Sequence, residues 1–181
     1  MKNIGVNAVE FLPLQKFAYY EPPFNTRIES GLKNTWNPTF VNYWGYMTSF
    51  FHAPETLYAS GATTEHLTHI GLNTNVDHEL KSLIKACHQA GIAVIMDVVY
   101  NHASQYDLNP LKYTDKSGYY KLDHQGNYRN DSWTGNDLDS SKEATKNLIF
   151  SSIKHWLTEY KIDGFRFDLA GILDWACIDE L

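Results

Sequence analysis

Three short apolar runs, separated by two amphipathic segments, constrain the fold of this chain more than any other feature. The runs span residues 6–12, 92–99 and 164–169, and they are apolar almost throughout. Segments 77–90 and 140–160 carry apolar residues at helical spacing. Apolar strands that alternate with helices are typical of parallel βαβ units. We therefore predict an α/β fold in which the three runs are parallel strands.

Both predicted helices have recognisable ends. Asp77 is a candidate N-cap of the first helix, and Gly91 is a candidate stop. Ser140 and Glu143 form a capping-box pattern at the start of the second helix, and Gly164 opens the strand after it. With 181 residues, 43% of them hydrophobic, the chain is long enough to build one ordinary core.

The two connections that follow the first and second strands are unusually long. Residues 13–75 and 101–139 far exceed the few residues that such connections need. Both are rich in Tyr, Trp, His and Asn. Because both follow the carboxyl ends of strands, where α/β proteins hold their sites, they predict a functional site at that edge.

Charged residues stand at the ends of two predicted strands. Arg166 and Asp168 are two positions apart in the last run, so they point to the same side of a strand while Phe165, Phe167 and Leu169 pack opposite. The guanidinium keeps the neighbouring carboxylate ionised, as a nucleophile requires. The alternative is a structural ion pair.

Asp97 interrupts the middle apolar run, and His102 lies just beyond it. A buried Asp that caps a loop beside a satisfied histidine is the structural alternative to a functional pair. A third cluster spans residues 42–48 and includes Trp44 and Tyr46. It is interpreted either as a stacking platform for a sugar ring or as aromatic packing that pins a long loop.

Several classes of function are disfavoured. No Gly-rich phosphate loop follows a strand, and no Gly-x-Ser-x-Gly elbow is present, which argues against nucleotide binding and serine hydrolysis. The net charge of −6 indicates neither a nucleic-acid nor a membrane partner. Cys87 and Cys177 are interpreted as free thiols of a reducing compartment. The first residues lack a signal-peptide core, so a cytoplasmic location is favoured if the N-terminus is native; otherwise the location is unknown.

Taken together, segments 97–102, 164–170 and 42–48 resemble the α-amylase superfamily (glycoside hydrolase family 13), with isoamylase-type debranching enzymes nearest and pullulanases next. The resemblance runs over essentially the whole chain. It implies a TIM (β/α)8 barrel, of which residues 1–181 form a fragment of the single catalytic domain with about three consecutive βα units. Segment 135–139 is similar to another part of the substrate cleft.

The resemblance also implies roles for individual residues. Asp168 becomes the nucleophile, and Arg166 orients it. An α-glucan is the expected partner; His102 hydrogen-bonds hydroxyls of the sugar at the cleavage site, and Tyr46 and Trp44 form the stacking platform. Asp97 is mainly structural. Asn101 matches a position that binds calcium in many amylases but often lacks the ion in debranching relatives, so no metal or cofactor is assigned.

The implied reaction is retaining hydrolysis of α-glucosidic bonds, foremost the α-1,6 branch points of glycogen or starch. Such hydrolysis needs two carboxyl groups about 5–5.5 Å apart. The family takes its acid/base glutamate from the strand after the one that bears Asp168, and only residues 171–181 follow here. We therefore expect these residues alone to be inactive. The alternatives are a pullulanase, a branching enzyme, another superfamily member, or a non-catalytic α-glucan-binding remnant.

Overall fold

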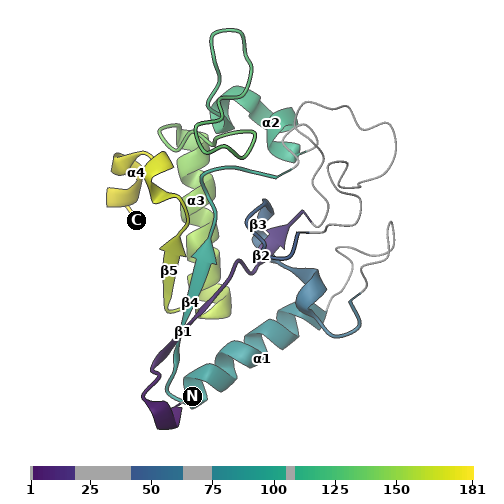
Figure 1. Cartoon of the computed structure of the whole chain (residues 1–181), viewed down its shortest axis with the longest axis vertical. Helices are drawn as coiled ribbons and strands as arrows, with labels where there is room; N and C mark the ends of the chain where they lie inside the picture. The colour runs from purple at the N-terminus through teal and green to yellow at the C-terminus, as the bar shows by residue number, and fades with distance from the viewer. Residues whose placement is uncertain (1, 19–41, 63–74, 105–108) are drawn as a thin grey trace.

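A three-stranded parallel sheet forms the centre of the structure, a computed structural model that describes residues 2–18, 42–62, 75–104 and 109–181. Its strands are β1 (Ala8–Phe11), β4 (Ala93–Val98) and β5 (Gly164–Phe167), in the order β1-β4-β5 (Figure 1). All three predicted strands and their parallel pairing are confirmed, although each strand is shorter than expected.

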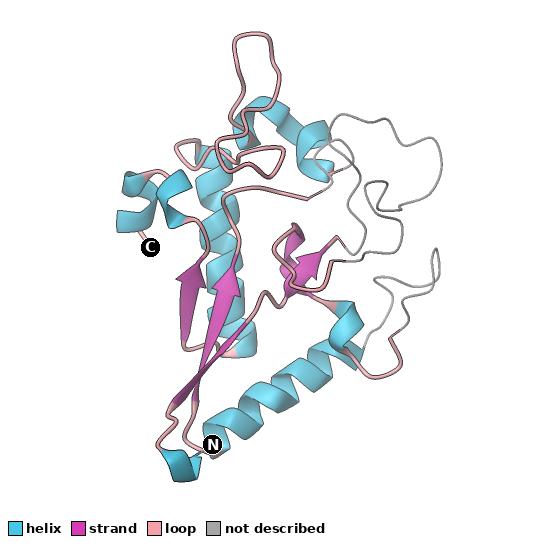
Figure 2. Cartoon of the chain, in the orientation of Figure 1, coloured by secondary structure: helices cyan, strands magenta, loops and turns pink. Residues whose placement is uncertain are grey.

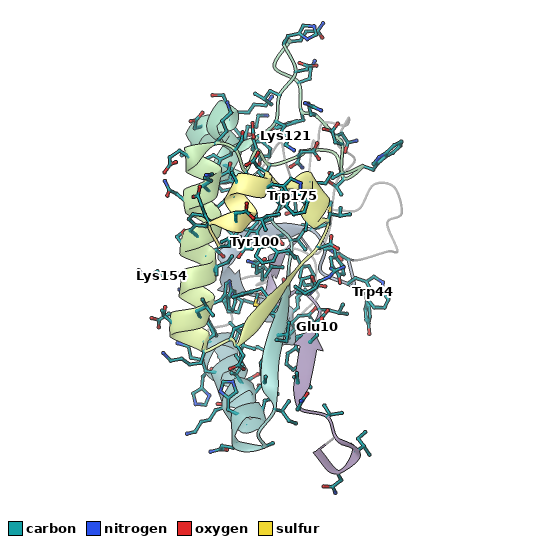
Figure 3. The ribbon with its side chains drawn as sticks, turned by 90° about the vertical axis from the view of Figure 1, so that its left-hand side faces the viewer. Glu10, Trp44, Tyr100, Lys121, Lys154 and Trp175 are labelled. Carbon is teal, nitrogen blue, oxygen red and sulfur yellow. The ribbon has the colours of Figure 1, made fainter. Side chains whose placement is uncertain are left out.

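Two helices cover one face of this sheet. They are α1 (Asn75–Gln89) and α3 (Glu143–His155), and α3 continues as a π-helical turn over Trp156–Tyr160 (Figure 2). Alternate residues of β4, namely Val94, Met96 and Val98, are fully buried in the apolar cluster shared with the helices. The residues that alternate with them, Ala93, Ile95 and Asp97, therefore point to the opposite face. That face is where Figure 3 shows Glu10 and Trp44, away from α3.

The predicted helix ends are only partly correct. Gly91 has a φ of 69° and follows the end of α1, which confirms the predicted stop. Asp77 is not the N-cap, because α1 begins at Asn75 and the Asp77 carboxylate instead accepts a hydrogen bond from the Tyr160 hydroxyl. Ser140 is not a cap either. Its hydroxyl accepts the backbone N–H of Asp174 at 2.7 Å, and α3 begins at Glu143.

The long connections contain secondary structure that the sequence pattern did not predict. Within the first, β2 (Gln15–Phe17) pairs antiparallel with β3 (Thr48–Pro54), and the 3-10 helix Thr56–Tyr58 follows. The second contains α2 (Pro110–Tyr119) and the bridges Tyr120–Leu138 and Leu122–Tyr128. This pairing satisfies backbone groups that a packed connection would otherwise bury without partners. Residues 19–41, 63–74 and 105–108 of these connections lie outside the described residues.

Short elements complete the chain: the 3-10 helices Lys2–Ile4 and Ala170–Ile172, and α4 (Trp175–Asp179). Both cysteines are free, with Cys177 buried and Cys87 half-buried. In the described part of the chain, no helix has both the length and the apolar character needed to cross a membrane.

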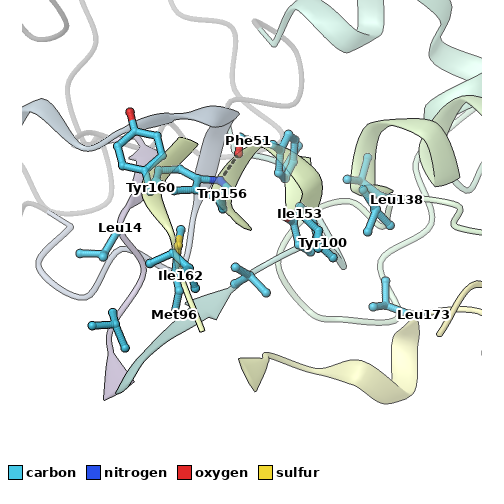
Figure 4. Packing of buried hydrophobic residues seen from close by; sticks show 14 of the residues in the cluster. Leu14, Phe51, Met96, Tyr100, Leu138, Ile153, Trp156, Tyr160, Ile162 and Leu173 are labelled. Atoms are coloured by element: carbon cyan, nitrogen blue, oxygen red, sulfur yellow. Dashed lines mark hydrogen bonds between the residues drawn. The ribbon is translucent and has the colours of Figure 1, made fainter. Parts of the chain in front are cut away.

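Trp156 joins the antiparallel pair to the helical layer. Its side chain is fully buried, and its indole N–H donates to the Phe51 carbonyl of β3 at 2.9 Å (Figure 4). The same carbonyl accepts the Ser152 hydroxyl at 2.6 Å. Two donors from α3 and its π-helical turn thus hold β3 against the core. Trp44 and Tyr46 lie just before β3, so the end of their segment that joins β3 is held in place as well.

Candidate active site

Arg166 links two carboxylates at the carboxyl ends of adjacent strands. The parallel register of β4 and β5 places Asp97 beside Arg166. One guanidinium nitrogen, Nη1, donates to both oxygens of Asp97 at 3.0 Å and to Oδ1 of Asp168 at 2.8 Å. The prediction that Arg166 and Asp168 project to the same side is therefore confirmed, and Asp97 joins them.

The three side chains differ in their access to solvent. The exposed fraction is 2% for Asp97, 19% for Asp168 and 45% for Arg166. The hydrogen bond to Asp97 is the main reason that the pKa of Arg166 is raised, so the guanidinium is permanently charged. The Asp97 carboxylate is thus the buried member of the group, while the Asp168 carboxylate is partly exposed to solvent.

The backbone of Asp168 is held at two further points. Its N–H donates to the Val98 carbonyl at 2.9 Å, and its carbonyl accepts the Asn101 side-chain amide at 2.8 Å. Leu169 does not continue the strand as predicted, because β5 ends at Phe167 and Leu169 has a φ of 45° and is 46% exposed. The chain turns here into the 3-10 helix, and the Asn101 bond braces this uncommon backbone conformation.

Tyr46 approaches the same group from the long first connection. Its hydroxyl donates to Oδ2 of Asp97 at 2.5 Å. Burial, reinforced by the hydrogen bond to Asp97, raises the pKa of Tyr46 to about 12, so the hydroxyl stays protonated and acts as a donor. Trp44 is 59% exposed and lies edge-to-face against Tyr43, with ring centroids 5.3 Å apart.

His102 is more deeply enclosed than its expected role in sugar binding suggested. It is 1% exposed, with Nδ1 2.5 Å from the Asn101 side-chain oxygen and Nε2 3.0 Å from the Tyr46 carbonyl. Burial lowers its pKa to about 4, against the effect of the Tyr46 carbonyl. A sugar hydroxyl would have to replace one of these protein partners to reach the ring.

The buried His102 predicts acid sensitivity. Between about pH 6.5 and pH 4 the unfolded chain binds a proton that the folded ring does not, so the free energy of unfolding should fall as the pH falls, by about 1 kcal/mol per pH unit. Urea denaturation of the longest polypeptide in which the gene encodes this chain, compared between the wild type and His102→Gln at several pH values, checks this. The variant should show the smaller pH dependence, and equal slopes would contradict the assignment.

Segment 135–139 acts in this structure as a brace. Asn136 is fully buried and exchanges two hydrogen bonds with Ala103, at 3.0 and 2.6 Å. The Leu138 N–H donates to the Asn101 carbonyl at 2.9 Å. Sequence reasoning missed this role of Asn136, although a buried asparagine inside a polar, Gly-containing stretch is a usable signal for a side chain that replaces backbone pairing.

Both ends of the Asn101 side chain are used by protein partners, namely the Asp168 carbonyl and His102. Among the residues that the structure describes, no group of three or more His, Cys, Asp or Glu side chains could hold a metal ion. A cavity of about 620 Å³ lies apart from the carboxylates, between β1, α1 and the end of β3, and none of the site residues lines it.

Comparison with known proteins gives consistent matches. Residues 45–176 match the family described as alpha amylase, catalytic domain. The chain is 41% identical to isoamylase 3, chloroplastic, of Oryza sativa subsp. japonica over 94% of its own length, and 34% identical to pullulanase of Bacillus subtilis over 96%. It spans about a fifth of the length of these curated relatives, 21% in both cases.

A solved structure is similar in fold as well as in sequence. The crystal structure of pullulanase from Paenibacillus barengoltzii, in complex with maltohexaose and alpha-cyclodextrin, superposes with a TM-score of 0.78 at 30% identity. The match covers 99% of this chain and 25% of that one.

Proposed function

This chain belongs to the alpha-amylase catalytic-domain family and has its TIM-barrel-derived α/β fold, and from that premise we propose that it is part of a retaining α-glucan debranching hydrolase. The observation that carries the proposal is the ion pair of Arg166 with Asp168 at the end of β5. A partly exposed carboxylate, held in place by a permanent cation, is suited to attack a glycosidic carbon.

We assign the other site residues to binding and support. In the proposal Tyr46 and Trp44 contact the sugar, and His102 contributes once the substrate displaces the Tyr46 carbonyl. Asp97 and Asn101 support Arg166 and the Asp168 backbone, as their hydrogen bonds suggest. The substrate is an α-glucan, with α-1,6 branch points of glycogen or starch as the cleaved bonds.

The three βα units are proposed to be the second, third and fourth of an eight-stranded barrel. Among the described residues, strand β1 pairs on one side only, with β4, and the 620 Å³ cavity beside it is walled by apolar residues such as Phe11, Leu14 and Leu80. A preceding βα unit of the same barrel is the occupant that fits, because it would pair with β1 and pack on α1. Free strand edges are otherwise a hazard for aggregation.

A second carboxyl group is required for the reaction. Asp97 is an unsuitable proton donor, because its oxygens accept hydrogen bonds from Arg166 and Tyr46. Among the described residues, no glutamate is hydrogen-bonded to Arg166 or Asp168. We therefore assign the acid/base glutamate to the following strand of a longer polypeptide, and we expect residues 1–181 alone to be inactive and prone to aggregate.

The test compares two preparations on glycogen, pullulan and amylose. One is the 181-residue chain, and the other is the longest polypeptide in which the gene encodes it. We expect reducing ends only from the longer polypeptide, with branched glycogen or pullulan preferred over amylose. Hydrolysis by the 181-residue chain would refute the proposal of a partial barrel, and binding without hydrolysis by both would favour a non-catalytic glucan-binding protein.

A further inference from the structure

Trp133 is the most exposed large hydrophobic side chain among the described residues, at 90%. In the part of the chain that the structure describes, it is also one of three non-glycine residues with a positive φ, at 64°. Both properties are unfavourable for a bulky aromatic residue, because the backbone conformation is strained and the ring buries no area. A tryptophan that is present despite these two unfavourable properties is a candidate for a role in binding or catalysis rather than in stability.

The turn that carries Trp133 is rigid. Asn130 accepts the Gly135 N–H through its side chain at 2.6 Å and the Trp133 N–H through its backbone carbonyl at 3.3 Å. The buried carboxylate of Asp137 accepts the N–H groups of Asp131 and Ser132 at 2.6 and 3.0 Å. The indole is therefore presented by a fixed scaffold, which lowers the entropy cost of binding.

The turn that carries Trp44 is built in the same way. The Asn42 side chain accepts the Gly45 N–H at 3.0 Å, and Gly45 has a φ of 86°. In both turns an asparagine locks a glycine of positive φ, and an exposed tryptophan lies between the two. Trp44 was singled out in the sequence, whereas Trp133 was not.

Both turns are also fastened to one short segment, residues 101–103. The Trp44 turn reaches it through the Tyr46 carbonyl, which lies 3.0 Å from Nε2 of His102. The Trp133 turn reaches it through Asn136, which bonds Ala103 in both directions. The same segment supplies Asn101, which holds the Asp168 carbonyl. The two tryptophan-bearing turns are thus held by the same segment that positions the backbone of Asp168.

We propose that Trp133 is a second stacking platform for the α-glucan chain, at a position beyond the sugar held between Trp44 and Asp168. This inference rests on the proposed function. The flat C–H face of a pyranose ring matches an exposed indole. The flanking hydroxyls of Ser132 and Thr134 both donate to the Asn136 carbonyl, at 3.2 and 3.1 Å, and so help to hold the turn that presents the ring. The occupant is a linear maltooligosaccharide stretch rather than the branch point itself.

The test uses the longest polypeptide in which the gene encodes this chain, with maltohexaose as the probe in isothermal titration calorimetry. Trp133→Ala should weaken the Kd by about tenfold, whereas Trp133→Tyr should stay within about threefold. Tyr113→Ala, which removes another exposed ring on α2, is the matched control and should bind as the wild type does. Unchanged affinity in Trp133→Ala would overturn the proposal.

Trp133→Gly separates a binding role from a structural one. Glycine accepts the positive φ without strain, so the Tm of this variant should equal or exceed that of the wild type, while its Kd for maltohexaose weakens by about tenfold, as in Trp133→Ala. A clear drop in Tm would mean that the ring is packed against another part of the longer protein, and it would overturn the proposal. Binding that weakens in Trp133→Ala, together with hydrolysis that survives in Asp168→Asn, would uphold the platform and refute the proposed nucleophile.

Discussion

Asp168→Asn is expected to lower kcat on glycogen or pullulan by about 10⁴-fold in the hydrolytic polypeptide that contains this chain. The amide keeps the shape of the side chain and can still meet Arg166 Nη1, which lies 2.8 Å from Asp168 Oδ1. It has no anionic oxygen with which to form a glycosyl intermediate. Reducing-end release measures the loss, and the Kd for maltohexaose should change little, because the fold and the aromatic platforms are untouched.

Asp174→Asn is the matched control for that experiment. Asp174 caps α4 and accepts the Ala176 N–H at 3.0 Å, and asparagine caps a helix equally well. The control should therefore retain full activity. A second readout identifies the chemistry: Asp168→Gly should turn over α-glucosyl fluoride when azide is added, as the C–F bond breaks and azide forms β-glucosyl azide. An Asp168→Asn variant with more than about a tenth of wild-type activity would contradict the role of nucleophile.

The strands and helices could be predicted because their signals are local. Apolar runs and helical spacing identified β1, β4, β5, α1 and α3 within a few residues. The two N-cap predictions were wrong because Asp77 and Ser140 have distant partners, Tyr160 and Asp174, which outcompete a local cap. A cap pattern reports only what a side chain can do nearby, and tertiary contacts decide what it does.

The residues of the site could be predicted from the sequence, but the hydrogen bonds between distant parts of the chain could not. The i, i+2 rule placed Arg166 and Asp168 on one side, since that relation lies within one strand. The contact between Asp97 and Arg166 depends on the register of two strands 69 residues apart. The hydrogen bond from Tyr46 to Asp97 depends on the path of the first long connection. The antiparallel strands of that connection, β2 and β3, show no clear alternation of apolar and polar residues in the sequence. Long-range register of this kind is fixed by packing, and no single-sequence pattern encodes it.

Arg166 is the residue that joins the two carboxylates of the site, and Arg166→Met tests this link. Methionine has a similar length but offers neither charge nor donor, so Asp168 loses the bond that orients it. Activity should fall by about 10²–10³-fold, as when one essential donor is removed from an active site. Arg129→Met is the matched control, because Arg129 is exposed and pairs only with Asp131 among the described residues; it should stay fully active.

Arg166→Met should also lower the free energy of unfolding, and a second substitution can identify the cause. Asp97 has a side chain only 2% exposed, and without the guanidinium it becomes a buried anion with Tyr46 as its main donor. Breaking one half of a buried pair costs about 3–5 kcal/mol, and the partial exposure of Arg166 reduces that figure. Asp97→Asn added to Arg166→Met removes the stranded charge, so the urea midpoint should recover while activity stays low. If the double variant is no more stable than Arg166→Met, the loss arises from packing of the guanidinium stem and not from the charge on Asp97.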